Sequence, residues 1–171
     1  MSARSAAVTS HAPLSEPEMP AFVLDRHLFY WLTQLLERRN LQLSAALKPA
    51  NLRVPEWRAL ASLRARHHLS MSEMADITNI ERTTLSRTID RMVRAGWINR
   101  LTDTSDARVT RLALTVAGER LFERIWPAVH AVNSAALAGV PEPAVEMTRW
   151  ALQQMCRNFD SLDRHGLQEN V

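Results

Sequence analysis

The segment from residue 81 to residue 94 places apolar and polar side chains on opposite faces of a helix. Successive residues of an α-helix step by about 100° around its axis. On that step Leu85, Ile89 and Met92 fall on one face, together with Val93. The opposite face carries only hydroxyl, guanidinium and carboxylate groups, from Thr83, Thr84, Arg87, Asp90, Arg91 and Arg94. The pattern predicts a helix with one face in a core and the other directed at a partner.

The same region holds the excess positive charge of the chain. Residues 81–111 contain seven arginines and four acids, a balance of +3, which equals the formal net charge of the whole chain. Basic charge confined to one segment is typical of a surface that meets phosphates. Guanidinium groups bond base edges or phosphates, and short hydroxyls allow close approach to a groove. The segment therefore predicts DNA binding, with a solvated basic helix as the alternative.

The flanking residues predict a second helix before this one. Ser70 and Glu73 have the spacing of a capping box, which would begin a helix from Met71 to Ile77. Residues 78–80 would then form the turn between the two helices. Gly96 follows the last periodic residue, where a left-handed cap would end the basic helix.

A hairpin is expected after Gly96. Two extended runs, about 97–101 and 109–114, are separated by a polar stretch that is rich in turn-forming residues. Helix, turn, basic helix and two-stranded hairpin together have the layout of a winged helix-turn-helix.

Long amphipathic stretches lie on both sides of this region. Apolar residues recur at helical spacing from 22 to 47, and Pro55 suits the first turn of a helix over 56–66. After Thr115, which suits an N-cap, a helix is predicted towards Ala138 with a bend at Pro127. A last helix is expected over about 142–162. A small winged region could not cover all these apolar stripes, so they predict a partner.

These features resemble the MarR-type (multiple antibiotic resistance regulator) transcription factors over about residues 21–164. The resemblance rests on the order of the elements and on four stretches, which are Thr84–Arg91, Gly96–Ile98, Asp106–Arg108 and Leu112–Thr115. It implies a mainly α fold, in which a winged helix-turn-helix with a two-stranded wing is flanked by N- and C-terminal helices. Those helices would intertwine with a second copy as a dimerisation domain.

The resemblance implies five parts along the chain. They are a disordered tail (1–20), an N-terminal dimerisation helix (21–54), the DNA-binding domain (55–114), the C-terminal dimerisation helices (115–164) and a short tail (165–171). A two-fold homodimer would read a pseudo-palindromic operator in double-stranded DNA, with half-sites about 10 bp apart.

The DNA-binding residues are expected on the basic helix and the wing, namely Thr83, Thr84, Ser86, Arg87, Arg91, Arg94 and Arg108. By the resemblance, Arg108 would enter the minor groove and Asp106 would support the wing. Glu81 occupies the place of an acid that in the family often pairs with that arginine. Ala107 departs from the pattern, because an additional basic residue is usual there, so one phosphate contact per wing would be missing.

An effector site is also implied by the resemblance. Effectors in the family are often aromatic acids or phenols, held where the dimer helices meet the winged domain. The matching elements offer His27, Tyr30, Trp31, Gln34, Trp57 and Arg58. An arginine beside indole rings suits a planar carboxylate, through paired hydrogen bonds and stacking. Ordinary core packing of Trp31 and Trp57 is the alternative.

We therefore expect a homodimeric repressor that a small aromatic carboxylate or phenol releases from its operator. The first alternative is a DNA-binding regulator with no small-molecule effector. The second is a regulator that responds to oxidants through Cys156, although Cys156 lies between Met155 and Phe159, where packing is the simpler interpretation.

Other classes of function lack support in the sequence. Neither a glycine-rich phosphate loop nor a nucleophile and base signature is present, so we expect no enzyme and no cofactor. The adjacent His67 and His68 would diverge on a helix, so no metal site is expected. A single cysteine, the lack of a membrane-spanning apolar run and the polar residues 1–18 predict a cytoplasmic protein.

Overall fold

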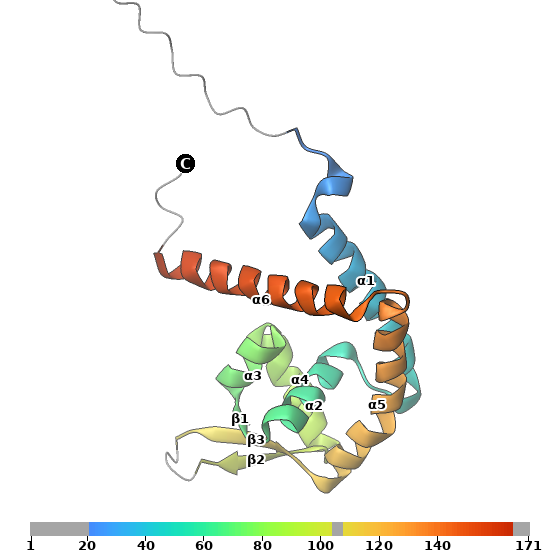
Figure 1. Cartoon of the computed structure of the whole chain (residues 1–171). Helices are drawn as coiled ribbons and strands as arrows, with labels where there is room; N and C mark the ends of the chain where they lie inside the picture. The colour runs from blue at the N-terminus through green and yellow to red at the C-terminus, as the bar shows by residue number, and fades with distance from the viewer. Residues whose placement is uncertain (1–20, 104–107, 166–171) are drawn as a thin grey trace, which may run out of the picture. The chain divides into compact units, whose positions relative to one another are not determined.

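The computed structural model describes residues 21–103 and 108–165, with side chains up to residue 162. Most of the described chain is helical, as expected (Figure 1). The elements in order are η1 (Leu24–Arg26), α1 (Leu28–Leu47), η2 (Lys48–Ala50), α2 (Val54–Arg66), β1 (Leu69–Ser70), α3 (Met71–Thr78), α4 (Arg82–Arg94), β2 (Ile98–Thr102), β3 (Thr110–Leu114), α5 (Val116–Leu137) and α6 (Glu142–His165). Among the described residues, no helix is both long and apolar enough to cross a membrane.

The chain divides after Leu35, within α1, into two units. In the first unit the expected helix does not begin at Phe22. A 3-10 turn, η1, comes first, and the extended backbone of His27 separates it from α1. The indole Nε1 of Trp31 donates a hydrogen bond of 2.8 Å to the Asp25 carbonyl oxygen, which ties η1 to the first turns of α1.

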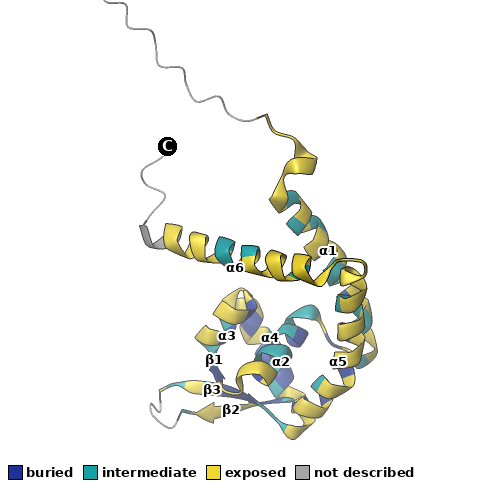
Figure 2. Cartoon of the chain, viewed as in Figure 1, coloured by how far each residue is buried: buried dark blue, intermediate teal, exposed yellow. Residues whose placement is uncertain are grey.

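The second unit contains the hydrophobic core. α2 packs against α3, α4, α5 and β3, so it lies at the centre of this unit. The buried positions that Figure 2 shows in dark blue gather on the inner faces of these elements. Side chains that are essentially fully buried include Leu43, Leu47, Leu60, Leu63, Met74, Leu85, Ile89, Met92, Ile98, Leu112 and Val129.

The sheet has three antiparallel strands in the order β1-β3-β2. The hairpin of β2 and β3 was predicted, and its register runs from Ile98 opposite Leu114 to Thr102 opposite Thr110. Strand β1 was not predicted. It pairs only Leu69 with Leu112 and Ser70 with Arg111, and two residues are too few to show the alternation that marks a strand in sequence.

The predicted ends of the two central helices are confirmed. The Ser70 hydroxyl accepts from the Glu73 N–H and the Glu73 carboxylate accepts from the Ser70 N–H, which forms the capping box of α3. α4 ends at Arg94, and Gly96, two residues further on, has a left-handed φ of 73°. The N–H groups of Gly96 and Trp97 donate to the carbonyl oxygens of Val93 and Met92, a Schellman motif.

Large apolar side chains remain exposed on the first and last helices of the described chain. On α6, Met147, Trp150 and Phe159 are each more than half exposed, and Leu152 and Leu162 are also exposed. On α1 the exposed apolar side chains are Leu28, Phe29, Trp31, Leu35, Leu36 and Leu41. Such a set of apolar side chains on two elements is typical of a surface that a partner covers.

The wing joins α5 through a tight junction at Thr115. The Thr115 hydroxyl accepts from the Gly118 N–H at 3.0 Å, as the predicted N-cap of α5. The Thr115 N–H donates to the Trp97 carbonyl oxygen at 3.0 Å. A Cβ placed on Gly118 would lie only 2.2 Å from that same oxygen. The backbone of Trp97 therefore requires glycine at position 118.

We predict that Gly118→Ala lowers the free energy of unfolding by about 3 kcal/mol, because the added methyl must displace the Trp97 backbone and weaken its bond to Thr115. Chemical denaturation of the purified variant measures the change. The control is Gly139→Ala, where the added Cβ meets nothing within 4 Å and only the φ of 78° opposes it. An equal or larger loss in Gly139→Ala would contradict the steric explanation.

Candidate nucleic-acid interface

Helix α4 has the two faces that the sequence predicts. Leu85, Ile89 and Met92 are 0% exposed and hold the helix in the core. The opposite side presents the expected polar residues. Of these, Thr83, Thr84, Ser86, Arg87 and Arg94 are exposed, whereas Arg91 is half-buried.

Glu81 caps the beginning of α4. Its two carboxylate oxygens accept hydrogen bonds from the backbone N–H groups of Thr83 at 2.8 Å and Thr84 at 2.9 Å. These two bonds lower the pKa of Glu81, so the carboxylate stays charged at the positive end of the helix dipole. The sequence predicted instead that Glu81 supports the wing. Asp106 lies outside the described residues and Arg108 is exposed, so the support of the wing by Glu81 and Asp106 stays a prediction.

Arg91, Arg100 and Arg111 each contact an acid of the described chain. Arg91 contacts Glu56 at 2.7 Å, and Arg100 contacts Asp90 at 2.6 Å. Arg111 contacts both Asp103 and Glu73 at 2.6 Å.

The Arg111 contacts tie the wing to the start of α3. The hydrogen bond with Asp103 raises the pKa of Arg111, and the negative charge of Glu73 raises it further. The Ser70 N–H lowers the pKa of Glu73, and Arg111 lowers it further. Arg111 therefore has a structural role that a count of charges does not reveal.

The remaining positive charge of α4 is concentrated on Arg82, Arg87 and Arg94. All three are exposed, and within residues 21–103 and 108–162 none of them forms an ion pair with an acid. Arg82 was not predicted as a site residue, because the 100° step assigns it to the apolar side. At the first position of the helix, however, no preceding turn covers it. Its Nη2 reaches the Ser72 hydroxyl at 3.4 Å.

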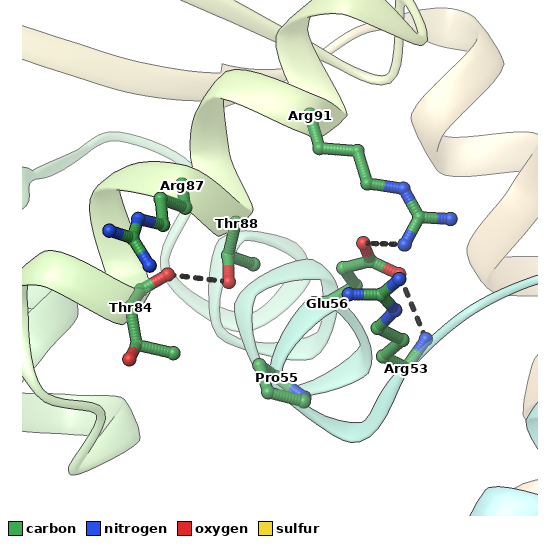
Figure 3. A pocket seen from close by; sticks show the side chains of 7 residues that line it. All are labelled: Arg53, Pro55, Glu56, Thr84, Arg87, Thr88 and Arg91. Atoms are coloured by element: carbon green, nitrogen blue, oxygen red, sulfur yellow. Dashed lines mark hydrogen bonds and ion pairs between the residues drawn. The ribbon is translucent and has the colours of Figure 1, made fainter.

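Arg91, which was predicted to bind DNA, also connects α4 to the start of α2. Its Nη1 lies 2.7 Å from Glu56 Oε1, and its Nη2 donates to the Asn51 carbonyl oxygen at 2.9 Å. Glu56 is only 2% exposed, and its Oε2 accepts from the Arg53 N–H at 2.8 Å (Figure 3). A charge buried to this degree requires a partner, so the contact with Arg91 helps to fix α4 against α2.

A pocket of about 260 Å³ lies beside this contact, between α2 and α4. Figure 3 shows the side chains that line it, which are Arg53, Pro55, Glu56, Thr84, Arg87, Thr88 and Arg91. Sequence analysis had not selected Arg53, since it lies outside the helix-turn-helix and follows no periodic pattern.

Trp57 belongs to a group of aromatic rings between α2 and α5. It is 5% exposed, and its ring lies 5.3 Å from Phe122 and 6.4 Å from Trp126, with interplanar angles of 10° and 13°. The edge of His130 meets Trp126 at 5.5 Å, and the Arg64 guanidinium lies 5.9 Å above the Phe122 ring. Phe122, Trp126 and His130 are four residues apart on α5, and this spacing, which was not used in the predictions from sequence, places their rings on one face of the helix.

The other predicted effector residues are divided between the two units. Arg58 is half-buried on α2, whereas His27, Tyr30, Trp31 and Gln34 belong to the first unit. A pocket shared by all six stays a prediction. Cys156 is exposed on α6, so the expected packing of this thiol is not observed within the described chain.

Comparisons with known proteins agree with this geometry. Residues 52–110 match the model of the MarR family. The HTH-type transcriptional repressor IacR of Pseudomonas putida is 26% identical over 147 residues, which cover 86% of this chain and 88% of that protein.

Solved structures with the same fold include two of interest. A MarR family transcriptional regulator from Silicibacter pomeroyi has a TM-score of 0.73 and 25% identity, covering 90% of this chain and 100% of that one. BpsR of Bordetella bronchiseptica, described with a mechanism for regulation of its DNA binding by 6-hydroxynicotinic acid, has a TM-score of 0.71 and 18% identity over 80% of this chain and 97% of its own.

We predict that Glu56→Gln lowers the free energy of unfolding by about 1–3 kcal/mol, because Arg91 loses its charge partner in a half-buried position. Asp90→Asn is the matched control, since Asp90 also pairs with an arginine but both side chains are nearly half exposed. Screening by water limits that loss to about 0–1 kcal/mol. Denaturant titrations compare the two variants, and a greater loss in Asp90→Asn would show that the Glu56 contact does not fix α4.

Proposed function

We propose that this chain, which matches the MarR family of transcriptional regulators over residues 52–110, is a homodimeric repressor that a small aromatic ligand releases from operator DNA. The observation that carries the proposal is the exposed face of α4. It combines short hydroxyl side chains with arginines that no acid neutralises among the described residues. This combination suits entry into a major groove.

The residues of α4 and the wing are proposed to differ in their roles at the DNA. Thr83, Thr84, Ser86 and Arg87 are proposed to reach base edges, because they lie on the exposed face of the first two turns. Arg94, at the end of α4, is proposed to contact phosphate, and Arg108 to enter the adjacent minor groove from the wing. Arg91 is proposed to position α4 through Glu56 and to add its charge to this surface.

A second copy of the chain is the proposed partner of α1 and α6. Their exposed apolar side chains, among them Leu41 at 70% and Met147 at 65%, would be costly in water. A two-fold dimer would present two copies of α4 and would therefore bind a pseudo-palindromic operator.

An aromatic carboxylate is the proposed class of effector. The near-parallel rings of Trp57, Phe122 and Trp126 offer stacking surfaces, and Trp126 is 41% exposed. Arg58 and Arg64 on α2 offer guanidinium groups for a carboxylate. BpsR, whose DNA binding is described as regulated by 6-hydroxynicotinic acid, provides a precedent for such a ligand in this fold.

We predict that Arg87→Ala weakens operator binding by about 1–3 kcal/mol and relaxes the preference at one base pair, because it removes a bidentate contact from the middle of the exposed face. Selection of bound sequences from a random pool first defines the operator. Binding to single-base variants of that operator then locates the relaxed position.

The control for this experiment is Arg149→Ala, which removes an exposed arginine from α6. We expect it to preserve the rank order of the variant operators. If Arg87→Ala also preserved that order, its proposed role in reading bases would be wrong.

We predict that benzoates, hydroxybenzoates or cinnamates raise the melting temperature and release the operator. To lower DNA affinity tenfold, the ligand must bind the DNA-free protein about 1.4 kcal/mol more favourably than the DNA-bound protein. Cyclohexanecarboxylate is the matched ligand control, since it has the carboxylate but no aromatic face. Trp126→Leu should remove the response to the aromatic acids.

Two results would redirect this part of the proposal. If none of these acids changes either the melting temperature or operator binding, a regulator without a small-molecule effector is favoured. If peroxide releases the operator and Cys156→Ser abolishes the release, the exposed thiol of Cys156 is the sensor.

A further inference from the structure

The pocket between the start of α2 and α4 has a strongly basic lining. Three of its seven lining residues are arginines, and one is an acid. Arg53 comes directly before α2, while Arg87 and Arg91 belong to α4. With Glu56 ionised, the lining carries a net charge of +2, which favours an anion.

The only acid of the lining is already occupied. Glu56 Oε1 contacts Arg91 and Glu56 Oε2 accepts the Arg53 N–H, so both oxygens are engaged beneath the pocket. Arg91 is held in turn by the Asn51 carbonyl oxygen. The buried Nη1 of Arg91 is in an ion pair with Glu56, but its N–H groups are not aligned for a hydrogen bond within the described chain.

Arg53 and Arg87 thus provide the available charge. Both are exposed, and neither is in an ion pair with any acid of the described chain. Thr84 also lines the pocket and is exposed. Two guanidinium groups and a hydroxyl match the several acceptor oxygens of a phosphate group.

We propose that this pocket receives one phosphate of the operator backbone and that Arg53 is a further DNA-binding residue. The inference rests on the proposed function and extends the interface beyond α4 and the wing. A backbone phosphate is the favoured anion because Thr84 and Arg87 belong both to the pocket and to the face that is proposed to read bases. A helix in the major groove lies between two phosphate backbones, so an arginine beside that helix meets phosphate.

The test compares Arg53→Gln with Arg66→Gln in the full chain. Arg66 is the last residue of α2 and is exposed, so both variants remove one charge from opposite ends of the same helix. Binding to an unrelated DNA duplex is measured over a series of salt concentrations, because a phosphate contact does not depend on base sequence. Each lost contact should reduce the slope of log affinity against log salt by about 0.9, which gives about 2 for a dimer.

A second measurement locates the phosphate. Methylphosphonate replacements, one at a time along the operator, remove single charges from the backbone. At one position of each half-site the replacement should weaken wild-type binding and leave Arg53→Gln unaffected. Arg53→Lys keeps the charge and should retain most of the salt slope.

An unchanged slope in Arg53→Gln would overturn the proposal, and so would an equal decrease in Arg66→Gln, which would indicate a general effect of net charge. If inorganic phosphate stabilised the free protein in an Arg53-dependent manner while the slope stayed constant, the pocket would serve a small anion and the DNA assignment would be wrong. If the wild type bound no duplex at low salt, the proposed function itself would fail. If the wild type binds DNA and Arg53→Gln changes neither the affinity nor the salt slope, only the proposed phosphate site is wrong and the proposed function stands.

Discussion

The contact of Glu56 with Arg91 joins α2 to α4, and the arrangement of the proposed DNA-binding elements depends on it. A carboxylate that is 2% exposed is stable only when it is paired, so the first turn of α2 and the third turn of α4 must stay together. The same carboxylate accepts the Arg53 N–H, which fixes the beginning of α2. Together with the buried face of α4, this charge therefore fixes the position of α4 beside the adjacent pocket.

Local patterns could be predicted from the sequence, and remote pairings could not. The two faces of α4, the capping box of α3, the Gly96 cap and the Thr115 N-cap depend on residues that are close in the sequence, and all were predicted correctly. The ion pairs of Arg91 with Glu56 and of Arg111 with Glu73 join residues more than 30 positions apart, and no periodicity marks such a pair. The two-residue strand β1 and the late start of α1 were missed because neither has a repeated pattern.

A count of charges therefore selects a region of the chain better than it identifies the arginines that are available to a partner. The excess of +3 in residues 81–111 selects the region that is proposed to bind DNA. In the structure, however, Arg91, Arg100 and Arg111 are engaged by acids, two of which lie outside that range. Arg53, which the count excluded, lies in the same pocket as Arg87. Only arginines that are not paired with acids of the same chain are available to a partner, and the fold is needed to identify them.

The first turn of α2 also suggests how an effector could act on the DNA-facing elements. Glu56 and Trp57 are adjacent, so their side chains point about 100° apart around the helix, one to α4 and the other to Phe122 and Trp126 of α5. A ligand that shifts Trp57 must move Glu56 with it. Separating Glu56 from Arg91 would leave a buried charge unpaired, at a cost of about 3–5 kcal/mol, so we expect α4 to move together with α2. In the proposed dimer, an effector would therefore change the distance between the two copies of α4 and leave each copy unaltered. By linkage, bound operator would weaken effector binding by the same factor.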